Sequence, residues 1–139
     1  MALALTVTGA PAAEDVAAIG AGLTAFNEAD AGPADRQALA VLVRDAADEL
    51  VAGISGFSAW GWLYVQWLWV AEAQRGAGLA GRMLEAAEAE ARRRGCHGAH
   101  IDTFNPVALK VYRRAGYLPF GELDDFPAGR TRTFLRKRL

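Results

Sequence analysis

The chain of 139 residues contains a single cysteine, Cys96, which excludes an internal disulfide and any cysteine-based metal cluster. No apolar run approaches the roughly 20 residues that a membrane-spanning helix needs. The opening MALALTVTGAP lacks the basic segment and the long apolar stretch of a signal peptide. Internal repeats, low-complexity tracts and interdomain linkers are also absent. We therefore expect one domain (1–139), no metal, no membrane attachment and a cytoplasmic location.

A large excess of charge of either sign is missing too. The 15 Lys and Arg residues nearly balance the 16 Asp and Glu residues, so the net charge is −1. Nucleic-acid-binding domains normally carry a strong basic excess, which makes nucleic acid an unexpected partner. The charge is unevenly spread, however, because residues 1–50 carry two Arg and eight acids, whereas residues 51–139 are net basic. A basic second half suits a small anionic ligand.

Segments with strand and helix periodicity alternate along the chain. The expected order is β-α-β-β-β-α-β-α-β-β. This order predicts an α/β domain with a mixed central sheet of about seven strands flanked by helices. The first strand is expected at Leu3–Thr8, and the strand at 61–70 is apolar enough to be buried on both faces. The later segments predict strands at 37–45, 50–60, 95–104, 118–126 and 131–139, and helices within 12–32, 77–94 and 105–117.

The segment QRGAGLAG, residues 74–81, places three glycines at the start of a strong helix-forming run. Glycine weakens a helix, so its use there indicates that the backbone needs an unusual conformation or a close approach to something else. The free amides and the dipole at a helix start favour an anion. Arg75 adds a positive charge at the same place. The segment therefore predicts a cradle for a phosphate or diphosphate.

Two nucleotide-binding motifs can be compared with these glycines. A nucleoside-triphosphate loop needs Gly-Lys-Ser/Thr, but Gly78 is followed by Leu79. The spacing of Gly76, Gly78 and Gly81 does fit a dinucleotide-binding fingerprint, and Asp102 lies about 20 residues further on, where that fingerprint has an acid. The antiparallel pattern before the motif and the few βα units after it argue against this second motif, although the spacing alone leaves it open.

Two segments resemble the signatures of the GCN5-related N-acetyltransferase (GNAT) superfamily. RGAGLA, residues 75–80, matches the family's pyrophosphate signature Gln/Arg-x-x-Gly-x-Gly/Ala. NPVALKVYRRAGY, residues 105–117, supplies the family's second element with Asn105, Ala108, Tyr112, Gly116 and Tyr117. The expected element order is also that of the family, and the N-terminal third matches only in this layout. The resemblance implies a GNAT fold and acetyl transfer from acetyl-CoA to an amine.

The resemblance also implies where acetyl-CoA binds. Backbone groups of Leu68, Trp69 and Val70 would bind its pantetheine arm in a gap between two strands, and the amide of Trp69 or Val70 would stabilise the oxyanion. Asn105 would contact the same arm, and it can also cap the following helix. The diphosphate would be held by the amides of Arg75, Gly76, Ala77, Gly78, Leu79, Ala80 and Gly81.

By its position in the family motif, Tyr112 is the candidate acid that protonates the departing thiolate, although it could also simply pack on its helix. Many family members carry a Glu on the strand before the signature, but Gln66 stands there and cannot take a proton. Asp102 is a better catalytic carboxylate than Glu72, and His100 shares its face by alternation. A water chain or an acceptor of low pKa would need no dedicated base.

The acceptor pocket is expected between the end of the first helix and the central strands. Aromatic side chains there can pack in the core or stack on a cationic amine, and a carboxylate would favour a positively charged substrate. The candidate substrate-binding residues are Asn27, Trp62, Tyr64, Gln66 and Asp125. We expect an N-acetyltransferase for a small amine, working as a homodimer. The alternatives are a protein N-terminal or lysine acetyltransferase and a CoA-binding regulatory module without turnover.

Overall fold

The computed structural model describes residues 2–139, and the contacts divide the chain into two units, Met1–Ala34 and Asp35–Leu139. The first unit consists of a segment without regular secondary structure and helix α1 (Ala13–Ala31). The predicted helix is therefore present, and none of its residues is buried. Its apolar stripe is exposed: Val16, Ile19, Leu23 and Phe26. No helix within residues 2–139 is long and apolar enough to cross a membrane.

The prediction of a strand at Leu3–Thr8 is wrong. The described chain has no strand there, and Leu3, Leu5 and Val7 are each at least 90% exposed. An alternating run becomes a strand only when its N–H and C=O groups pair with a neighbouring strand. The sheet formed by residues 2–139 contains no such pair for this run and has six strands instead of about seven.

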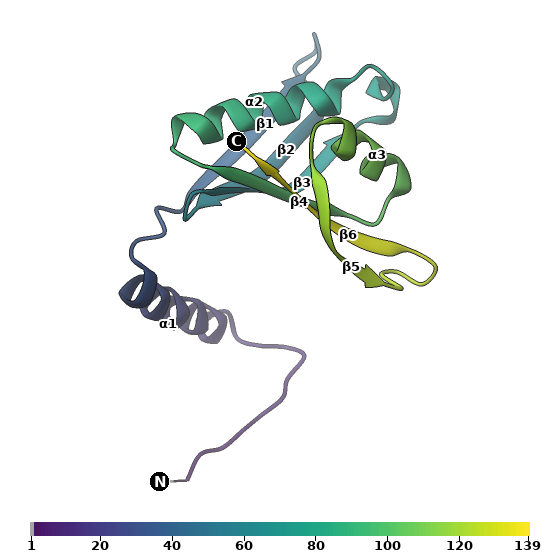
Figure 1. The fold of residues 1–139 in the computed structure, drawn as a ribbon. Helices are drawn as coiled ribbons and strands as arrows, with labels where there is room; N and C mark the ends of the chain where they lie inside the picture. Colours follow the sequence, from purple (N-terminus) through teal and green to yellow (C-terminus); the bar gives the residue numbers. More distant parts are fainter. Residues whose placement is uncertain (1) are drawn as a thin grey trace. The chain divides into compact units, whose positions relative to one another are not determined.

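The six strands form one mixed sheet in the order β1-β2-β3-β4-β6-β5 (Figure 1). Their bounds are β1 (Gln37–Arg44), β2 (Leu50–Ala59), β3 (Trp62–Val70), β4 (Gly98–Thr103), β5 (Leu118–Asp124) and β6 (Thr131–Arg138). Only β3 and β4 pair in parallel, and all other neighbours are antiparallel. The structure thus confirms the predicted hairpin of β1 and β2 and the parallel strand–helix–strand unit in the middle.

Helices α2 (Leu79–Arg93) and α3 (Pro106–Arg114) lie on one side of the sheet, and a short 3-10 turn (Glu72–Gln74) precedes α2 (Figure 1). Helix α2 starts two residues later than expected, because Gly78 before it adopts a left-handed conformation with φ 74°. Its apolar residues recur at helical spacing and pack on the sheet. The core of this side includes Ile54, Leu63, Val65, Met83, Leu84, Ala87 and Ala91.

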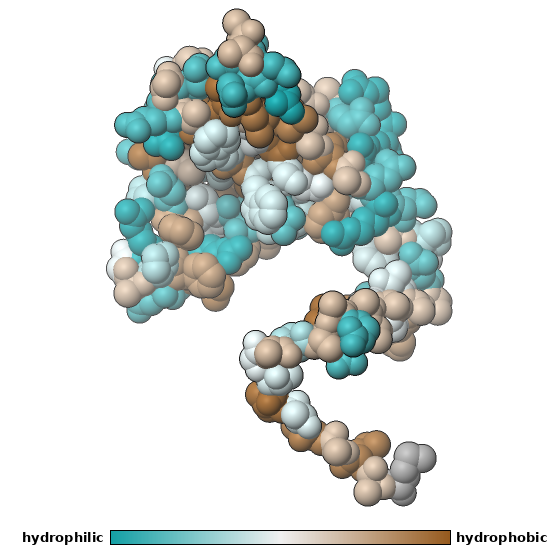
Figure 2. Space-filling model, turned by 180° about the vertical axis from the view of Figure 1, so that it is seen from behind, coloured by the Kyte–Doolittle hydropathy of each residue, from teal (hydrophilic) through white to brown (hydrophobic). Residues whose placement is uncertain are grey.

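The opposite face of the sheet carries aromatic side chains. Successive strand residues point to opposite faces, so Trp62 and Tyr64 lie on the side away from Leu63. An extra residue at Gln66 shifts the alternation by one, so Trp67 and Trp69 continue this face, and they are 67% and 50% exposed. The prediction that β3 is buried on both faces is therefore wrong. Figure 2, which views the molecule from behind, shows apolar and pale side chains in the centre of this side and hydrophilic ones toward its edges.

A β-bulge interrupts the ladder between β2 and β3. The register shifts between Ser55 and Gly56, which leaves Gln66 of β3 as an extra residue. A Cβ atom on Gly56 would collide with the carbonyl oxygen of Tyr64, so this position needs glycine. Bulges bend a strand and increase its twist. The pairing of β3 with β4 ends at Val65, just before the bulge, and the two central strands part beyond it.

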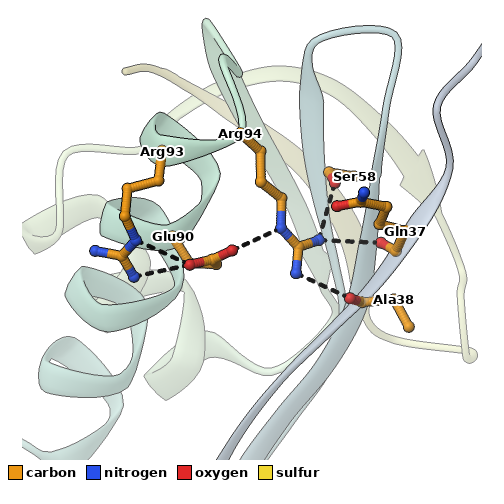
Figure 3. A network of polar contacts seen from close by, with 6 residues as sticks. All are labelled: Gln37, Ala38, Ser58, Glu90, Arg93 and Arg94. Carbon is orange, nitrogen blue, oxygen red and sulfur yellow. Dashed lines mark hydrogen bonds and ion pairs between the residues drawn. The ribbon is translucent and has the colours of Figure 1, made fainter.

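Arg94 ties the C-terminal end of α2 to the strands β1 and β2 (Figure 3). Its guanidinium donates to the carbonyl oxygens of Gln37 and Ala38 at 3.3 and 3.1 Å and to Ser58 Oγ at 3.1 Å. It also pairs with Glu90, one helical turn earlier, at 2.8 Å. Side-chain bonds to backbone carbonyls fix the helix end on the sheet.

Candidate functional site

A groove of about 700 Å³ lies where β3 and β4 part. It is lined by the end of β3, by the glycine-rich turn with the first residues of α2, and by the β4–α3 connection with α3. It brings together every residue predicted to bind acetyl-CoA except Ala77, which lies in the same turn. Sequence reasoning missed three polar groups of its lining, Gln74, Thr103 and Arg114. The position of Arg114 two residues after Tyr112 gave no signal, because side chains two apart on a helix do not face each other.

The glycine-rich turn presents a bare backbone to the groove. Gly76 and Gly78 have φ of 83° and 74°, a left-handed conformation that other residues rarely adopt. A Cβ atom on either would meet no atom within 4 Å, so open space surrounds both. No side chain caps α2 at Gly78, and the first amides of a helix have no intrahelical acceptor. These amides can donate to an anion in the groove.

Two further residues shape this end of the groove. The Nε of Arg75 donates to the carbonyl oxygen of Val70 at 3.0 Å, which links the turn to the end of β3 and keeps a cation there. Gly81 lies in the first turn of α2, lines the groove and would also have open space around a Cβ atom. Because a helix does not itself need glycine at this position, its use leaves room for a ligand close to the backbone.

Tyr112 of α3 lines the groove but is only 6% exposed. Burial, followed by the negative charge of Asp102, raises the pKa of Tyr112 to about 12. The phenol therefore keeps its proton near neutral pH and can donate it. Asn105 caps the same helix as predicted, because its Oδ1 accepts from the amides of Val107 at 2.8 Å and Ala108 at 3.1 Å.

Asp102 lies at the end of β4, in a network that joins three strands. Tyr64 of β3 donates its hydroxyl to Asp102 Oδ2 at 3.1 Å. Arg132 of β6 donates from Nε at 2.9 Å and from Nη2 at 2.6 Å to Oδ1 of the same carboxylate. Burial and the neighbouring Asp102 raise the pKa of Tyr64. Sequence reasoning missed Arg132, because no local spacing links positions 30 residues apart.

Aromatic rings surround this network. The imidazole of His100 stacks on the ring of Tyr64, with centroids 4.6 Å apart and planes inclined by 5°. Burial lowers the pKa of His100, which is therefore uncharged near neutral pH. Trp62 packs edge-on against His100 and His97, and a Cβ atom on Gly98 would collide with its ring. Trp62 lies at the start of β3, whereas Tyr64 lies close to the point at which β3 and β4 stop pairing.

Gln66 and Asp125 are not in the lining of the groove. Gln66 is the exposed extra residue of the bulge. Asp125 has φ 54° and accepts from the amide of Gly129 at 3.3 Å, so it shapes the β5–β6 turn. Asn27 belongs to α1 in the Met1–Ala34 unit, and a role beside the groove stays a prediction. Within residues 2–139, no group of three or more His, Cys, Asp or Glu side chains is arranged to hold a metal ion.

Comparisons with known proteins agree with this geometry. Residues 15–117 match the acetyltransferase (GNAT) family. An acetyltransferase of Agrobacterium fabrum (strain C58) is 45% identical over 117 residues, which cover 84% of this chain and 85% of that protein. The blasticidin-S acetyltransferase of Streptomyces morookaense is 41% identical over 92 residues, which cover 66% of this chain and 68% of that protein.

Solved structures share the fold. A crystal structure of an Agrobacterium tumefaciens protein assigned as an acetyltransferase superposes with a TM-score of 0.94 at 42% identity, covering 99% of this chain and all of that one. An acetyltransferase of Bacillus cereus has the same fold, with a TM-score of 0.85 at 23% identity over 96% of this chain and 98% of its own. The resemblance seen in the two sequence signatures is confirmed, and the dinucleotide interpretation of the glycine spacing is not needed. The chain therefore belongs to the acetyltransferase (GNAT) family and is an acyltransferase.

Proposed function

We propose that this chain transfers the acetyl group of acetyl-CoA directly to a primary amine of a small molecule. The observation that carries the proposal is the groove, which joins a bare glycine-rich turn, the end of β3 beyond its pairing with β4 and the buried phenol of Tyr112. A diphosphate, an extended amide chain and a thioester would each meet a suitable group along this groove.

The residues of the groove fit acetyl-CoA. The open space around Gly76, Gly78 and Gly81 admits a diphosphate beside the helix amides. Beyond Val65, the edge of β3 that faces β4 has no ladder partner within residues 2–139, so its backbone can bind the amides of a pantetheine arm. When bound, acetyl-CoA supplies an acetyl group activated as a thioester. Arg75 and Arg114 add positive charge.

The chain's own groups can then support the transfer. Tyr112 holds a proton for the departing thiolate, because its raised pKa keeps the phenol neutral. A backbone amide of Trp69 or Val70, both in the lining, would stabilise the oxyanion. Asp102 offers a carboxylate whose negative charge can attract an ammonium group. Direct transfer therefore needs no covalent intermediate on the protein.

A small-molecule acceptor is supported by one relative. The Streptomyces morookaense protein is named for the acetylation of blasticidin S, and it is 41% identical over two thirds of this chain. A protein N-terminus, a lysine side chain and CoA binding without turnover are the competing outcomes that an experiment must separate.

We also propose that both units belong to one acetyltransferase domain, because the family match at 15–117 spans the boundary between Ala34 and Asp35. A homodimer and a cytoplasmic location stay predictions from the sequence. Analytical ultracentrifugation of the full chain tests the dimer directly.

The function is tested by release of CoA from acetyl-CoA with a panel of acceptors. The panel should include blasticidin S, simple alkyl amines, a peptide with a free N-terminus and a lysine peptide. We expect acetylation of a small amine, and Tyr112→Phe should lower kcat by about 100-fold, as expected for loss of a general acid. Acetyl-CoA, and not NADH, should raise the melting temperature. Tight acetyl-CoA binding without CoA release from any acceptor would contradict the proposed function.

A further inference from the structure

Asp102 is held in one orientation by Arg132. Two N–H groups of the guanidinium bind the single oxygen Oδ1, at 2.9 and 2.6 Å. The pair is largely shielded, with 15% of the Asp102 side chain and 28% of the Arg132 side chain exposed. Charge-assisted bonds of this kind are short and directional. The contact with Arg132 therefore fixes the carboxylate plane and, with it, the position of the second oxygen.

That second oxygen, Oδ2, is occupied by the hydroxyl of Tyr64 at 3.1 Å. A phenol has one hydrogen to donate, and here Asp102 receives it. The Tyr64 oxygen is left with lone pairs that can only accept. The stacked imidazole of His100 and the edge of Phe57, with its centroid 5.7 Å away, hold the ring in place. Tyr64 is thus arranged to accept a hydrogen bond from a donor such as an ammonium group.

The Tyr64–Asp102 bond crosses the point at which the central strands part. Tyr64 pairs with His100 one position before the last β3–β4 rung, and Asp102 is the first residue of β4 beyond it. The groove starts at the same parting, where Thr103 follows Asp102. The charge of Asp102 also contributes to the raised pKa of Tyr112, so the carboxylate lies within electrostatic reach of the candidate acid. The network therefore lies next to the groove, whose lining includes Thr103 but neither Asp102 nor Tyr64.

We propose that Tyr64 passes the acceptor's proton to Asp102 and that Arg132 is a positioning residue for this step. The inference rests on the proposed function. An N–H bond of the substrate ammonium breaks and an O–H bond forms at Tyr64 Oη, while the original Tyr64 O–H bond breaks and an O–H bond forms at Asp102 Oδ2. The carboxyl group later releases this proton to solvent. It is the one net proton that amide formation from an ammonium and a thioester must release.

The proposal explains how a site with Gln66 in place of a strand carboxylate can still produce a neutral amine. The charged and titratable groups that face Asp102 are Tyr64 from β3, His100 from β4, Arg132 from β6 and Tyr112 from α3. Tyr112 and His100 are neutral near pH 7, so Arg132 is the cation in direct contact with the carboxylate. Its removal should leave Oδ1 without its two donors and let the carboxylate turn away from Tyr64.

The test compares Tyr64→Phe, Arg132→Gln and Arg132→Lys with wild type, using as probe the panel amine that gives the highest rate. Arg136→Gln is the matched control, because Arg136 lies on the same strand over the ring of Phe120, at 5.6 Å. For each variant, kcat and KM for the amine are measured across pH, together with the acetyl-CoA Kd and the melting temperature. These two last values show whether the fold and the groove are intact.

We expect Tyr64→Phe to lower kcat at pH 7 by about 100-fold, within the range of general acid–base catalysis. The defect should shrink as the pH approaches the pKa of the free amine, because an already neutral amine needs no proton relay. Arg132→Gln should lower kcat about 10-fold without weakening acetyl-CoA binding, with partial recovery in Arg132→Lys. Arg136→Gln should match wild type, and acetyl-CoA affinity should stay within about twofold in all variants.

If Tyr64→Phe and Arg132→Gln both kept the kcat and the pH profile of the wild type, the relay would be overturned and the proposed function would stand. The relay would also be overturned if Arg136→Gln lost as much kcat as the Tyr64 and Arg132 variants. The same holds if weaker acetyl-CoA binding or a lower melting temperature accounted for the whole loss of kcat. Absence of CoA release by the wild-type protein with every amine would contradict the proposed function and the relay together.

Discussion

Gly56 lies opposite the carbonyl oxygen of Tyr64 with no space for a side chain between them. At this point the β2–β3 ladder shifts register and Gln66 becomes an extra residue in β3. The pairing of β3 with β4 ends one residue before that bulge, at Val65, and the groove opens where the strands part. A glycine on a neighbouring strand is therefore linked to the shape of the groove.

Replacing Gly56 by alanine should force this contact apart. We expect Gly56→Ala to lower the free energy of unfolding by about 1–3 kcal/mol, the usual range for a destabilising point mutation, and to weaken acetyl-CoA binding by the folded protein. Gly121→Ala is the control, because Gly121 is also a strand glycine but a Cβ atom there meets open space. Urea denaturation and calorimetric titration measure both effects. Equal stability of the two variants would contradict the link.

Gly81→Ala separates folding from ligand binding. Alanine favours a helix over glycine by up to about 1 kcal/mol, so the melting temperature of the free protein should rise slightly. The added methyl group enters the open space beside the groove, and acetyl-CoA should bind at least about tenfold more weakly, which corresponds to 1.4 kcal/mol. Unchanged affinity in Gly81→Ala would show that the ligand does not approach this part of the backbone.

Tyr112 should make stability depend on alkaline pH. Burial and the charge of Asp102 raise its pKa from 10.0 to about 12 in the folded state. The raised pKa of Tyr112 therefore contributes about 3 kcal/mol to the free energy of unfolding. This contribution is complete below pH 10 and is lost as the pH rises through about 12. Tyr112→Phe should remove this part of the alkaline loss, leaving the part due to Tyr117, whose pKa burial and Glu88 also raise. Equal alkaline losses in Tyr112→Phe and wild type would contradict this assignment.

Arg94 and Arg93 offer a matched pair on one helix. Both bind Glu90, but Arg94 also donates to two backbone carbonyls of β1 and to Ser58 (Figure 3). Arg94→Ala should cost about 2–3 kcal/mol of unfolding free energy, because these acceptors lose a charged donor. Arg93→Ala should leave the melting temperature nearly unchanged, since exposed ion pairs contribute little. Equal effects in thermal melts would show that the contacts to β1 are not stabilising.

Local patterns predicted most of the fold between residues 37 and 139. The glycines at 76 and 78, the Asn105 cap with Pro106, and the apolar stripe of α2 act within a few residues, so the sequence alone identifies them. The strand at Leu3–Thr8 was wrong for the opposite reason, because alternation carries no information about whether a partner strand is present. The bulge could have been predicted from the sequence, because an isolated glycine inside a strand, such as Gly56, indicates one.

The candidate site also has features that the local sequence predicts and features that depend on the order of the strands. The predicted anion cradle follows from helix-start chemistry, which is local, and its residues line the groove except Ala77, while their role in binding stays a prediction. The contact of Asp102 with Arg132 depends on β4 and β6 being neighbours, a fact of topology rather than of spacing. The stacking of His100 on Tyr64 depends on the register of β3 and β4. These relationships appear only once the sheet order is known.

The proposed function requires that the groove binds acetyl-CoA so that its acetyl group reaches an amine. The most direct measurement is mass spectrometry of the amine panel after incubation with the protein and acetyl-CoA labelled in the acetyl group. We expect a labelled N-acetyl product from a small amine, formed together with free CoA and strongly reduced in Tyr112→Phe. Bound acetyl-CoA that stays intact with every amine, or a product formed equally well by Tyr112→Phe, would contradict it.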